Sequence, residues 1–188
     1  MANEAGQVRQ EELDAQRAAR RRTALAQIRQ YGDPVLRMRA REVEQFDDDL
    51  VRLAERMTRL MREANGVGLA GNQVGVLQRI VVIQPGAEEE PVALVNPELV
   101  ERDGAAETDD EGCLSLQGVL VPVERSSRVV VAAKDPQGGD IRLEFDELAA
   151  RVVQHELDHL DGVLIIDRTD DTARREALSV LRPRIVLS

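Results

Sequence analysis

The sequence predicts an α+β fold, with mostly antiparallel strands packed around one buried, metal-bearing helix. Several short apolar stretches, rich in Val, Ile and Leu and separated by turn-forming Gly, Pro, Asn and Asp, predict the strands. A later stretch has apolar residues at helical spacing and holds the chain's two histidines, four residues apart. With 188 residues, the chain is long enough to bury the core of one domain.

The N-terminal residues 1–26 differ in composition from the rest of the chain. They are rich in Ala, Gln and Arg and lack a wide apolar stripe, so we expect a solvated or frayed helix. We therefore predict a polar N-terminal extension over residues 1–26 and a single catalytic domain over residues 27–188. The arginine run at residues 20–22 is expected to be a solvated face rather than a nucleic-acid contact.

The first part of the domain is predicted to hold a turn, an extended stretch and one amphipathic helix. Residues 31–34 are typical of a turn, and residues 35–37 are expected to be extended. Three aspartates at residues 47–49 indicate a helix start, and Asn65-Gly66 indicates its end. The apolar residues between them are expected to face the core: Leu50, Leu53, Ala54, Met57, Leu60, Met61 and Ala64.

The strands are predicted from apolar runs between turns. Residues 79–83 and 92–95 are expected to pair as a hairpin, with Asn96-Pro97 ending the second strand and Asp103-Gly104 forming a turn. Further strands are expected at residues 98–102, 119–123, 128–133, 141–145 and 185–187. A short helix is expected over residues 172–181.

A helix predicted over residues 147–160, with Asp146 as its cap, carries the chemistry. His155 and His159 would lie one turn apart on one face, where two imidazoles can hold one metal ion. Glu156 lies between them and can act on a water bound by that ion. The alternative is a buried helix whose histidines only pack or hydrogen-bond.

The third ligand should be soft or anionic, and Cys113 is the natural candidate. It is the chain's one cysteine, and a lone cysteine is more often an inert, buried apolar residue. Three protein ligands plus a water form the open arrangement of catalytic sites, whereas structural zinc prefers four protein ligands. The sequence therefore predicts a catalytic site with one metal ion.

Composition limits the compartment and the partners. The net charge of −10 disfavours broad binding to phosphate backbones, so we expect no specific DNA partner. A single cysteine cannot form an internal disulfide, which fits a reducing cytoplasm. No apolar run approaches a membrane span, and acidic residues near the N-terminus argue against a transit peptide. We expect a cytoplasmic monomer or weak oligomer without a membrane partner.

Residues 66–73 (GVGLAGNQ), 111–115 (EGCLS) and 154–162 (QHELDHLDG) resemble, in order and spacing, the three motifs of the peptide deformylase family. Residues 31–37 (YGDPVLR) are similar to that family too. The resemblance covers roughly residues 26–168 and implies a peptide-deformylase-like fold. It implies removal of the N-formyl group from peptides and nascent chains that begin with formylmethionine, with release of formate. The ribosome is a further candidate partner.

The resemblance also implies the metal ligands and the general base. One divalent ion would be held by Cys113, His155 and His159. Fe(II) is the first expectation for this ion, and Zn, Ni or Co can replace it. Glu156 would act as general base towards the water that attacks the formyl carbon, and then as general acid towards the leaving amine.

The resemblance implies that four further residues contact the substrate through hydrogen bonds. The Gln73 side chain and the Leu114 backbone N–H would stabilise the oxyanion. The backbones of Gly68 and Gly112 would pair with the substrate as an added strand.

A supporting ion pair and an apolar substrate pocket complete the expected site. Arg125 falls where the family has an arginine that pairs with the glutamate of the second motif, here Glu111. Val67 borders the glycine-rich stretch, and Leu148 and Val152 lie one to two helical turns before His155, so we expect these three residues to line an apolar pocket beside the metal. An unbranched methionine side chain suits such a pocket.

The sequence departs from the family at four positions. Gly71 stands where a second alanine is usual, and it is expected to loosen the loop that positions Gln73. Gln117 replaces a common proline, and Glu147 occupies a position often held by glycine. Leu120 sits where a basic residue often contacts the distal substrate.

Three other interpretations remain at this point. A His-Glu-x-x-His metallopeptidase would usually take a further His or Glu as its third ligand. A structural metal protein would need a fourth protein ligand, and no second cysteine exists. A specialised deformylase acting on a formylated metabolite would keep the fold and change only the substrate.

Overall fold

The computed structural model describes residues 2–182, so the strand expected at residues 185–187 lies outside the described residues. The helices are α1 (Ala2–Leu25), α2 (Asp48–Glu63), α3 (Glu147–Leu160) and α4 (Asp171–Leu181), with the short 3₁₀ helices η1 (Pro34–Arg37), η2 (Gly71–Val74) and η3 (Ile165–Asp167). The strands are β1 (Gly68–Ala70), β2 (Ile80–Ile83), β3 (Val92–Gly112), β4 (Leu120–Lys134) and β5 (Asp140–Asp146). The predicted α+β class is confirmed.

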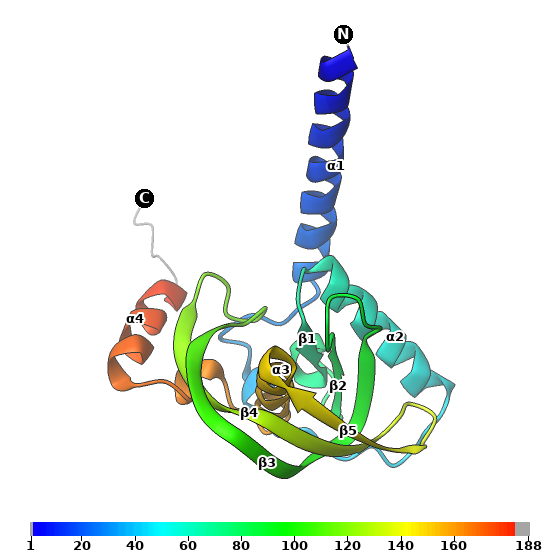
Figure 1. Cartoon of the computed structure of the whole chain (residues 1–188), viewed down its shortest axis with the longest axis vertical. Helices are drawn as coiled ribbons and strands as arrows, with labels where there is room; N and C mark the ends of the chain where they lie inside the picture. The colour runs from blue at the N-terminus through cyan, green and yellow to red at the C-terminus, as the bar shows by residue number, and fades with distance from the viewer. Residues whose placement is uncertain (1, 183–188) are drawn as a thin grey trace.

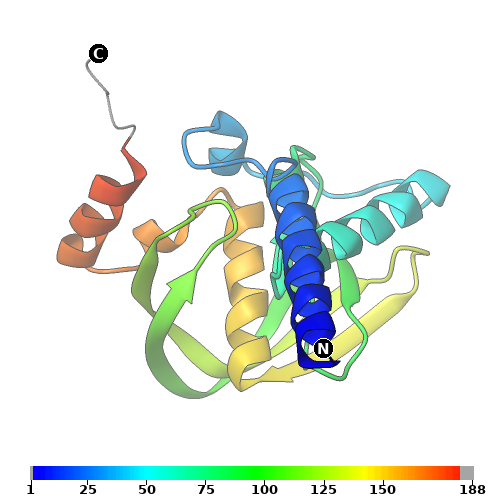
Figure 2. The same cartoon turned by 90° about the horizontal axis from the view of Figure 1, so that it is seen from above.

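A five-stranded antiparallel sheet curves around α3 (Figure 1). The strand order follows the chain, β1-β2-β3-β4-β5, so β1 pairs only with β2 and has one unpaired edge. The view from above also shows α3 within the curve of the sheet (Figure 2). Ala150, Val153 and Leu160 of α3 pack with apolar strand residues in one buried cluster. Each fully buried Val or Leu contributes about 2 kcal/mol, so this contact holds α3 in place.

The strands β3 and β4 are longer than the sequence predicts. The two strands expected between residues 92 and 102 are parts of β3, and the two expected between residues 119 and 133 are parts of β4. The expected breaks at Asn96 and Gly104 are instead places where the pairing of β3 with β4 shifts register. Both residues have positive φ, of 49° and 76°. Such residues serve a β-bulge as well as a turn, so the ladder continues past them.

Two local expectations are wrong. Residues 35–37 are not extended, because Pro34–Arg37 forms η1. The Asp33 side chain accepts a hydrogen bond from the Val35 N–H at 3.0 Å, and the proline fixes a helical φ at the first position. The helix α3 has the predicted bounds, but Asp146 at its N-cap makes no side-chain hydrogen bond to it.

The helix α1 projects away from the body of the protein, whereas α2 packs its apolar stripe into the core (Figure 1). The Asp47 side chain caps α2 by accepting hydrogen bonds from the Asp49 and Leu50 N–H groups, each at 3.0 Å. Ala24, near the end of α1, is fully buried in the same cluster. Within residues 2–182, none of the helices combines the length and the apolar character needed to cross a membrane.

Candidate metal centre and active site

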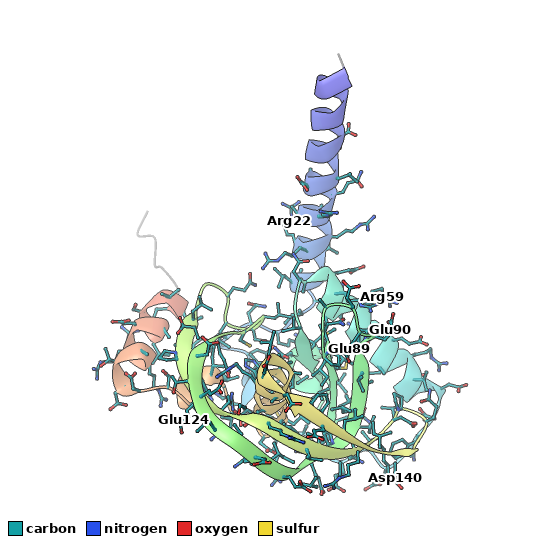
Figure 3. The ribbon with its side chains drawn as sticks, viewed as in Figure 1. Arg22, Arg59, Glu89, Glu90, Glu124 and Asp140 are labelled. Atoms are coloured by element: carbon teal, nitrogen blue, oxygen red, sulfur yellow. The ribbon has the colours of Figure 1, made fainter. Side chains whose placement is uncertain are left out.

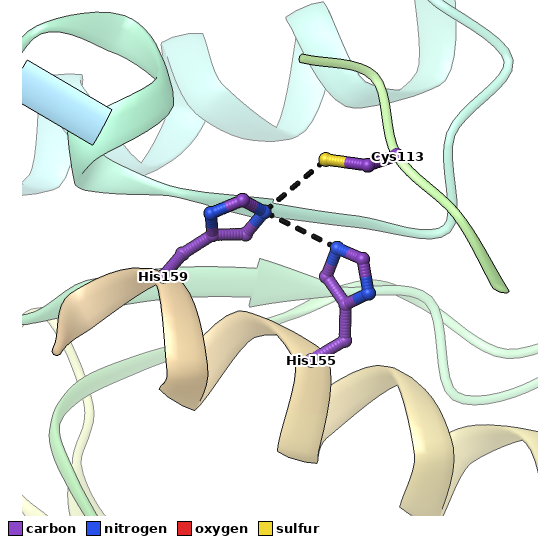
Figure 4. Close-up of side chains that lie close together, drawn as sticks. All are labelled: Cys113, His155 and His159. Carbon is purple, nitrogen blue, oxygen red and sulfur yellow. Dashed lines mark hydrogen bonds between the residues drawn. The ribbon is translucent and has the colours of Figure 1, made fainter. Parts of the chain in front are cut away.

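Three potential metal ligands meet between α3 and the end of β3. Cys113, His155 and His159 each offer one ligand atom, and these atoms lie within 4.8 Å of one another (Figure 4). His159 Nε2 lies 3.3 Å from Cys113 Sγ and 3.2 Å from His155 Nε2. Two imidazole nitrogens and one thiol are a donor set that suits Fe²⁺ or Zn²⁺. The residues therefore fit one divalent metal ion.

The backbone brings these ligands together from distant parts of the chain. Spacing of four residues on α3 places both histidines on one helical face. β3 ends at Gly112, so Cys113 begins the connection to β4. The Ser115 N–H donates to Cys113 Sγ at 3.4 Å, and the Leu116 N–H donates to the Cys113 carbonyl at 3.1 Å. This tight turn holds the thiol next to the histidines.

Glu111, near the end of β3, accepts hydrogen bonds from three side chains. Its Oε2 lies 3.0 Å from His155 Nδ1, and Arg125 donates to both of its oxygens, at 2.9 and 3.0 Å. Arg151 donates to Oε1 at 2.9 Å. Burial on its own would raise the pKa of Glu111, but the hydrogen bonds from His155 and Arg125 outweigh it and lower the pKa to about 2. Because its Nδ1 is engaged, His155 keeps Nε2 for a metal.

The two buried histidines have pKa values shifted in opposite directions. Burial would lower the pKa of His155, but the Cys113 thiol and the Glu111 carboxylate raise it well above its usual value. Burial, followed by the charge on His155, lowers the pKa of His159 well below its usual value. His159 is therefore neutral at pH 7, which is the state in which an imidazole binds a metal.

Glu156 lies beside this cluster with its carboxylate close to β1. It is buried, and its Oε2 has no hydrogen-bond partner among the described residues. A Cβ added at Gly68 would lie 2.3 Å from Glu156 Oε1, so the carboxylate occupies the space that glycine leaves open. Burial raises the pKa of Glu156 to about 7. A group with such a pKa can accept or donate a proton at neutral pH.

Gln73 is oriented by contacts at both ends of its side-chain amide. Its Oε1 accepts a hydrogen bond from the Ala70 N–H at 2.8 Å, which leaves Nε2 as the outward donor. Nε2 donates to Ser115 Oγ at 3.1 Å and lies 3.6 Å from Cys113 Sγ. Leu114 follows the cysteine and lines the same cavity as Gln73.

A cavity of about 700 Å³ opens beside the metal ligands. Its lining includes the five residues predicted to bind the substrate: Val67, Gly68, Gly112, Leu148 and Val152. Val152 is buried, whereas Leu148 is 63% exposed and Val67 is 44% exposed, so these two lie towards solvent. Since Gly68 begins β1, the unpaired edge of that strand borders the cavity.

Sequence reasoning missed two charged residues that support the site. Arg151 donates to Glu111 and, at 2.7 Å, to a backbone carbonyl of β4. It lies four residues before His155, and this helical spacing was the available signal. Asp158 accepts a hydrogen bond from Arg125 Nη1 at 2.6 Å, although it lies inside the histidine motif itself.

The four departures from the family have different surroundings. Gly71 is closely enclosed, because a Cβ there would lie 2.7 Å from the Gln78 carbonyl oxygen. The Gln117 side chain donates to Gln30 at 3.0 Å. Leu120 is 70% exposed at the cavity. Glu147 has φ of 48°, a left-handed conformation that favours glycine.

Fold and site together define a class of protein. A buried helix carries His155, Glu156 and His159, and a cysteine from the end of a strand completes a set of three ligands beside a substrate-sized cavity. This combination is typical of a metal-dependent hydrolase with an open coordination position.

Comparison with known proteins gives the family. A polypeptide deformylase family profile matches residues 25–175. Peptide deformylase of Dictyoglomus turgidum is 46% identical over 144 residues, which cover 77% of this chain and 92% of that protein. The chain belongs to the peptide deformylase family, and its activity is the removal of the N-formyl group from nascent peptides.

Solved structures agree with this assignment. The crystal structure of peptide deformylase from Thermotoga maritima matches with a TM-score of 0.73 and 48% identity, covering 76% of this chain and 96% of that one. The crystal structure of a peptide deformylase from Synechococcus elongatus, in complex with actinonin, matches with a TM-score of 0.77 and 40% identity. It covers 81% of this chain and 85% of that one.

Proposed function

We propose that Cys113, His155 and His159 hold one divalent ion and that Fe(II) is the native one. The meeting of three N and S donor atoms within 4.8 Å supports this ligand set. When bound, the ion supplies a Lewis acid that lowers the pKa of a water molecule and polarises the formyl oxygen. Zn, Ni or Co suits the same donors. Glu111, held by Arg125, orients the His155 ring.

Glu156 is proposed as the general base and then the general acid. It takes a proton from the water that attacks the formyl carbon. It then delivers that proton to the amine nitrogen as the C–N bond breaks and formate leaves. The buried carboxylate, with Oε2 free of hydrogen bonds among the described residues, supports this role because nothing competes for its lone pairs.

Gln73 Nε2 and the Leu114 backbone N–H are proposed to stabilise the negative charge that develops on the formyl oxygen. The Ala70 N–H holds the Gln73 carbonyl, so the amide is oriented before the substrate arrives. A donor fixed in advance stabilises a developing charge without the cost of reorganisation.

The substrate is proposed to lie as an added strand between Gly68 and Gly112, with its methionine side chain among Val67, Leu148 and Val152. All five residues line one cavity, and the edge of β1 is unpaired, which supports strand addition. An unbranched methionine adapts to irregular apolar space of this kind.

Residues 27–188 are proposed to form the single catalytic domain, with residues 1–26 as an N-terminal extension. The family profile, which begins at residue 25, supports this division. We further propose that the protein works in the cytoplasm, as a monomer or weak oligomer, on chains that emerge from the ribosome.

The meeting of three potential metal ligands, two of which line one cavity together with Glu156, carries this proposal. The test is formate release from formyl-Met-Ala-Ser by protein loaded anaerobically with Fe(II), compared with zinc-loaded and metal-stripped protein. We expect the iron form to be active, the stripped form to be inactive, and acetyl-Met-Ala-Ser to react far more slowly. Absence of formate release from the iron form would contradict the proposal.

The ligand set has its own test. Elemental analysis should give one ion per chain, and Cys113→Ala should lose tight binding because both charge and geometry are removed. A Cys113→Ala protein that keeps one tightly bound ion would refute this ligand.

A further inference from the structure

Arg21 of the N-terminal helix α1 lines the catalytic cavity, although sequence analysis placed it on a solvated face. Its Nε donates to the Ala64 carbonyl at 3.3 Å, at the C-terminal end of α2. Among the described residues, its two terminal nitrogens have no hydrogen-bond or carboxylate partner. A guanidinium held at one nitrogen and open at the other two is available to bind an anion.

Arg151 is the other arginine that lines this cavity, but its hydrogen bonds are already in use. It donates to Glu111 and to the Val123 and Glu107 carbonyls, at 2.7 to 2.9 Å. Of the two arginines among the described side chains that line the cavity, Arg21 is therefore the one whose terminal nitrogens remain free for a ligand.

Burial gives the direction in which a bound peptide leaves the site. Leu69 and Ala70, which follow Gly68 along β1, are fully buried, so a chain cannot continue past them. Val67 is 44% exposed, and Asn65 also lines the cavity. A peptide paired with this edge therefore runs from Gly68 past Val67 towards Asn65.

That path ends next to Arg21. Strand pairing matches residues one for one, so a first residue opposite Gly68 brings the third residue level with Gly66. Gly66 lies two residues after Ala64, whose carbonyl holds Arg21. Leu120, which is also exposed at this cavity, adds apolar surface and no charge.

We propose that Arg21 is a specificity-determining residue that favours substrates with an acidic side chain at the third position after the formyl group. The inference rests on the deformylase function and on strand addition at β1 proposed above. An exposed ion pair of this kind is expected to raise kcat/KM about three-fold and to weaken with salt.

The experiment compares three amidated peptides that differ only in the charge at the third residue: formyl-Met-Ala-Glu-Ser, formyl-Met-Ala-Gln-Ser and formyl-Met-Ala-Lys-Ser. The wild-type protein should prefer Glu over Gln by about three-fold and Gln over Lys, and about 0.5 M salt should reduce both ratios. Arg21→Ala should bring the ratios close to one, and Arg21→Glu should invert their order.

Arg22→Ala is the matched control, since it removes the same charge from the neighbouring position of α1 (Figure 3). Arg22 is not among the residues that line the cavity. It should keep the wild-type ratios. Equal losses for all three peptides in Arg21→Ala, with ratios unchanged, would mean that Arg21 only supports the fold, and this would overturn the proposal. The salt dependence of the wild-type ratios needs no variant, so it provides a test even if a variant fails to fold.

Binding separates this inference from the function on which it rests. Calorimetry on zinc-loaded Glu156→Ala protein should give the tightest Kd for the Glu peptide and the weakest for the Lys peptide. Three equal Kd values would overturn the role of Arg21 alone. Absence of formate release from all three peptides by wild-type protein would instead overturn the proposed function.

Discussion

The Glu111 carboxylate is the common partner of the charged and polar side chains around the metal centre. His155, Arg125 and Arg151 all bond to its two oxygens, and Asp158 bonds to Arg125 in turn. Removal of one partner from a buried ion pair usually costs about 3–5 kcal/mol, because the remaining charge has no compensation. The pairing of Glu111 with Arg125 was expected only from the family resemblance. Arg151 escaped notice because it lies on α3 and its partners lie on β3 and β4, far away in the sequence.

Glu156 is the residue whose proposed role separates chemistry from metal binding. Glu156→Ala should keep one ion per chain and lose about 10²-fold or more in turnover, since its carboxylate is the proposed carrier of the proton. Metal analysis and formate release on the same sample check this. Metal-replete Glu156→Ala with nearly normal turnover would remove the assigned role.

Gly68 should be required because Glu156 occupies the space of a side chain. In Gly68→Ala the new Cβ would lie 2.3 Å from Glu156 Oε1, so the carboxylate must move. A shift of that size is expected to lower kcat by about ten- to hundred-fold while the metal stays bound.

A double-mutant cycle tests that reason. If Gly68 acts through Glu156, adding Gly68→Ala to Glu156→Ala should lower the residual rate very little. Independent, multiplicative losses in the double variant would show that Gly68 acts elsewhere.

At the level of elements, α3 was predictable to the residue and β3 was not. The spacing of Val152, His155 and His159 depends only on helical periodicity, which can be read directly from the sequence. The bulges at Asn96 and Gly104 look like turns in sequence, because positive φ suits both. Whether the strand continues is decided by pairing with β4, a partner that local sequence does not specify.

Glu147, the first residue of α3, has φ of 48°, and this conformation costs an L-residue about 1 kcal/mol. Glu147→Gly should therefore raise the free energy of unfolding by up to about 1 kcal/mol. Urea unfolding measures this, with Glu147→Ala as the control that keeps a Cβ and should gain nothing. Equal effects of the two variants would show that the gain comes from loss of charge.

Asp167 of η3 ties this element to η1 and gives stability a pH dependence. It accepts hydrogen bonds from the Leu164 N–H, at 2.8 Å, and from Arg37. Burial would raise the pKa of Asp167, but the bonds from Arg37 and Leu164 lower it below the usual 3.8. A lowered pKa gives stability that is present in full above about pH 4 and is lost as pH falls towards the folded pKa.

Asp167→Asn should consequently cost about 0.5–1 kcal/mol at pH 7, and its difference from wild type should shrink below pH 4. Urea unfolding midpoints between pH 7 and pH 3 test this. Glu176→Gln is the control, since it removes the same charge from an exposed position on α4. A difference for Asp167→Asn that is constant with pH would exclude the carboxylate as its source.

At the scale of the whole molecule, sequence motifs pointed to the three residues that the structure brings together, Cys113, His155 and His159, but not to the direction of α1. The three motifs are short and local, and each carries residues that meet in space. The approach of Arg21 to the cavity depends on how α1 leaves the body after Ala24, and no local pattern encodes that angle. The polar composition of α1 predicted a solvated helix, but it did not indicate that the helix passes next to the cavity.

Truncation divides α1 into a projecting part and an anchored part. Deleting residues 2–16 should leave the melting temperature and kcat/KM unchanged, because the described side chains there are exposed. Deleting residues 2–26 also removes buried Ala24, and it should lower the melting temperature by a few degrees. Activity on a neutral peptide should stay within a few-fold in both cases.

The preference for an acidic third residue should survive the shorter deletion and disappear with the longer one. Loss of the preference with residues 2–16 alone would place its source further out on α1.

The separation of the metal ligands along the chain also affects when during folding the protein can bind its ion. Cys113 and His159 are 46 residues apart. The strands β4 and β5 and most of α3 lie between them in the sequence. An unfolded chain must close this loop before all three residues can hold one ion, and such closure is entropically costly. We therefore expect tight binding of the ion only after about the first 160 residues have been synthesised and have folded far enough to bring the three ligands together.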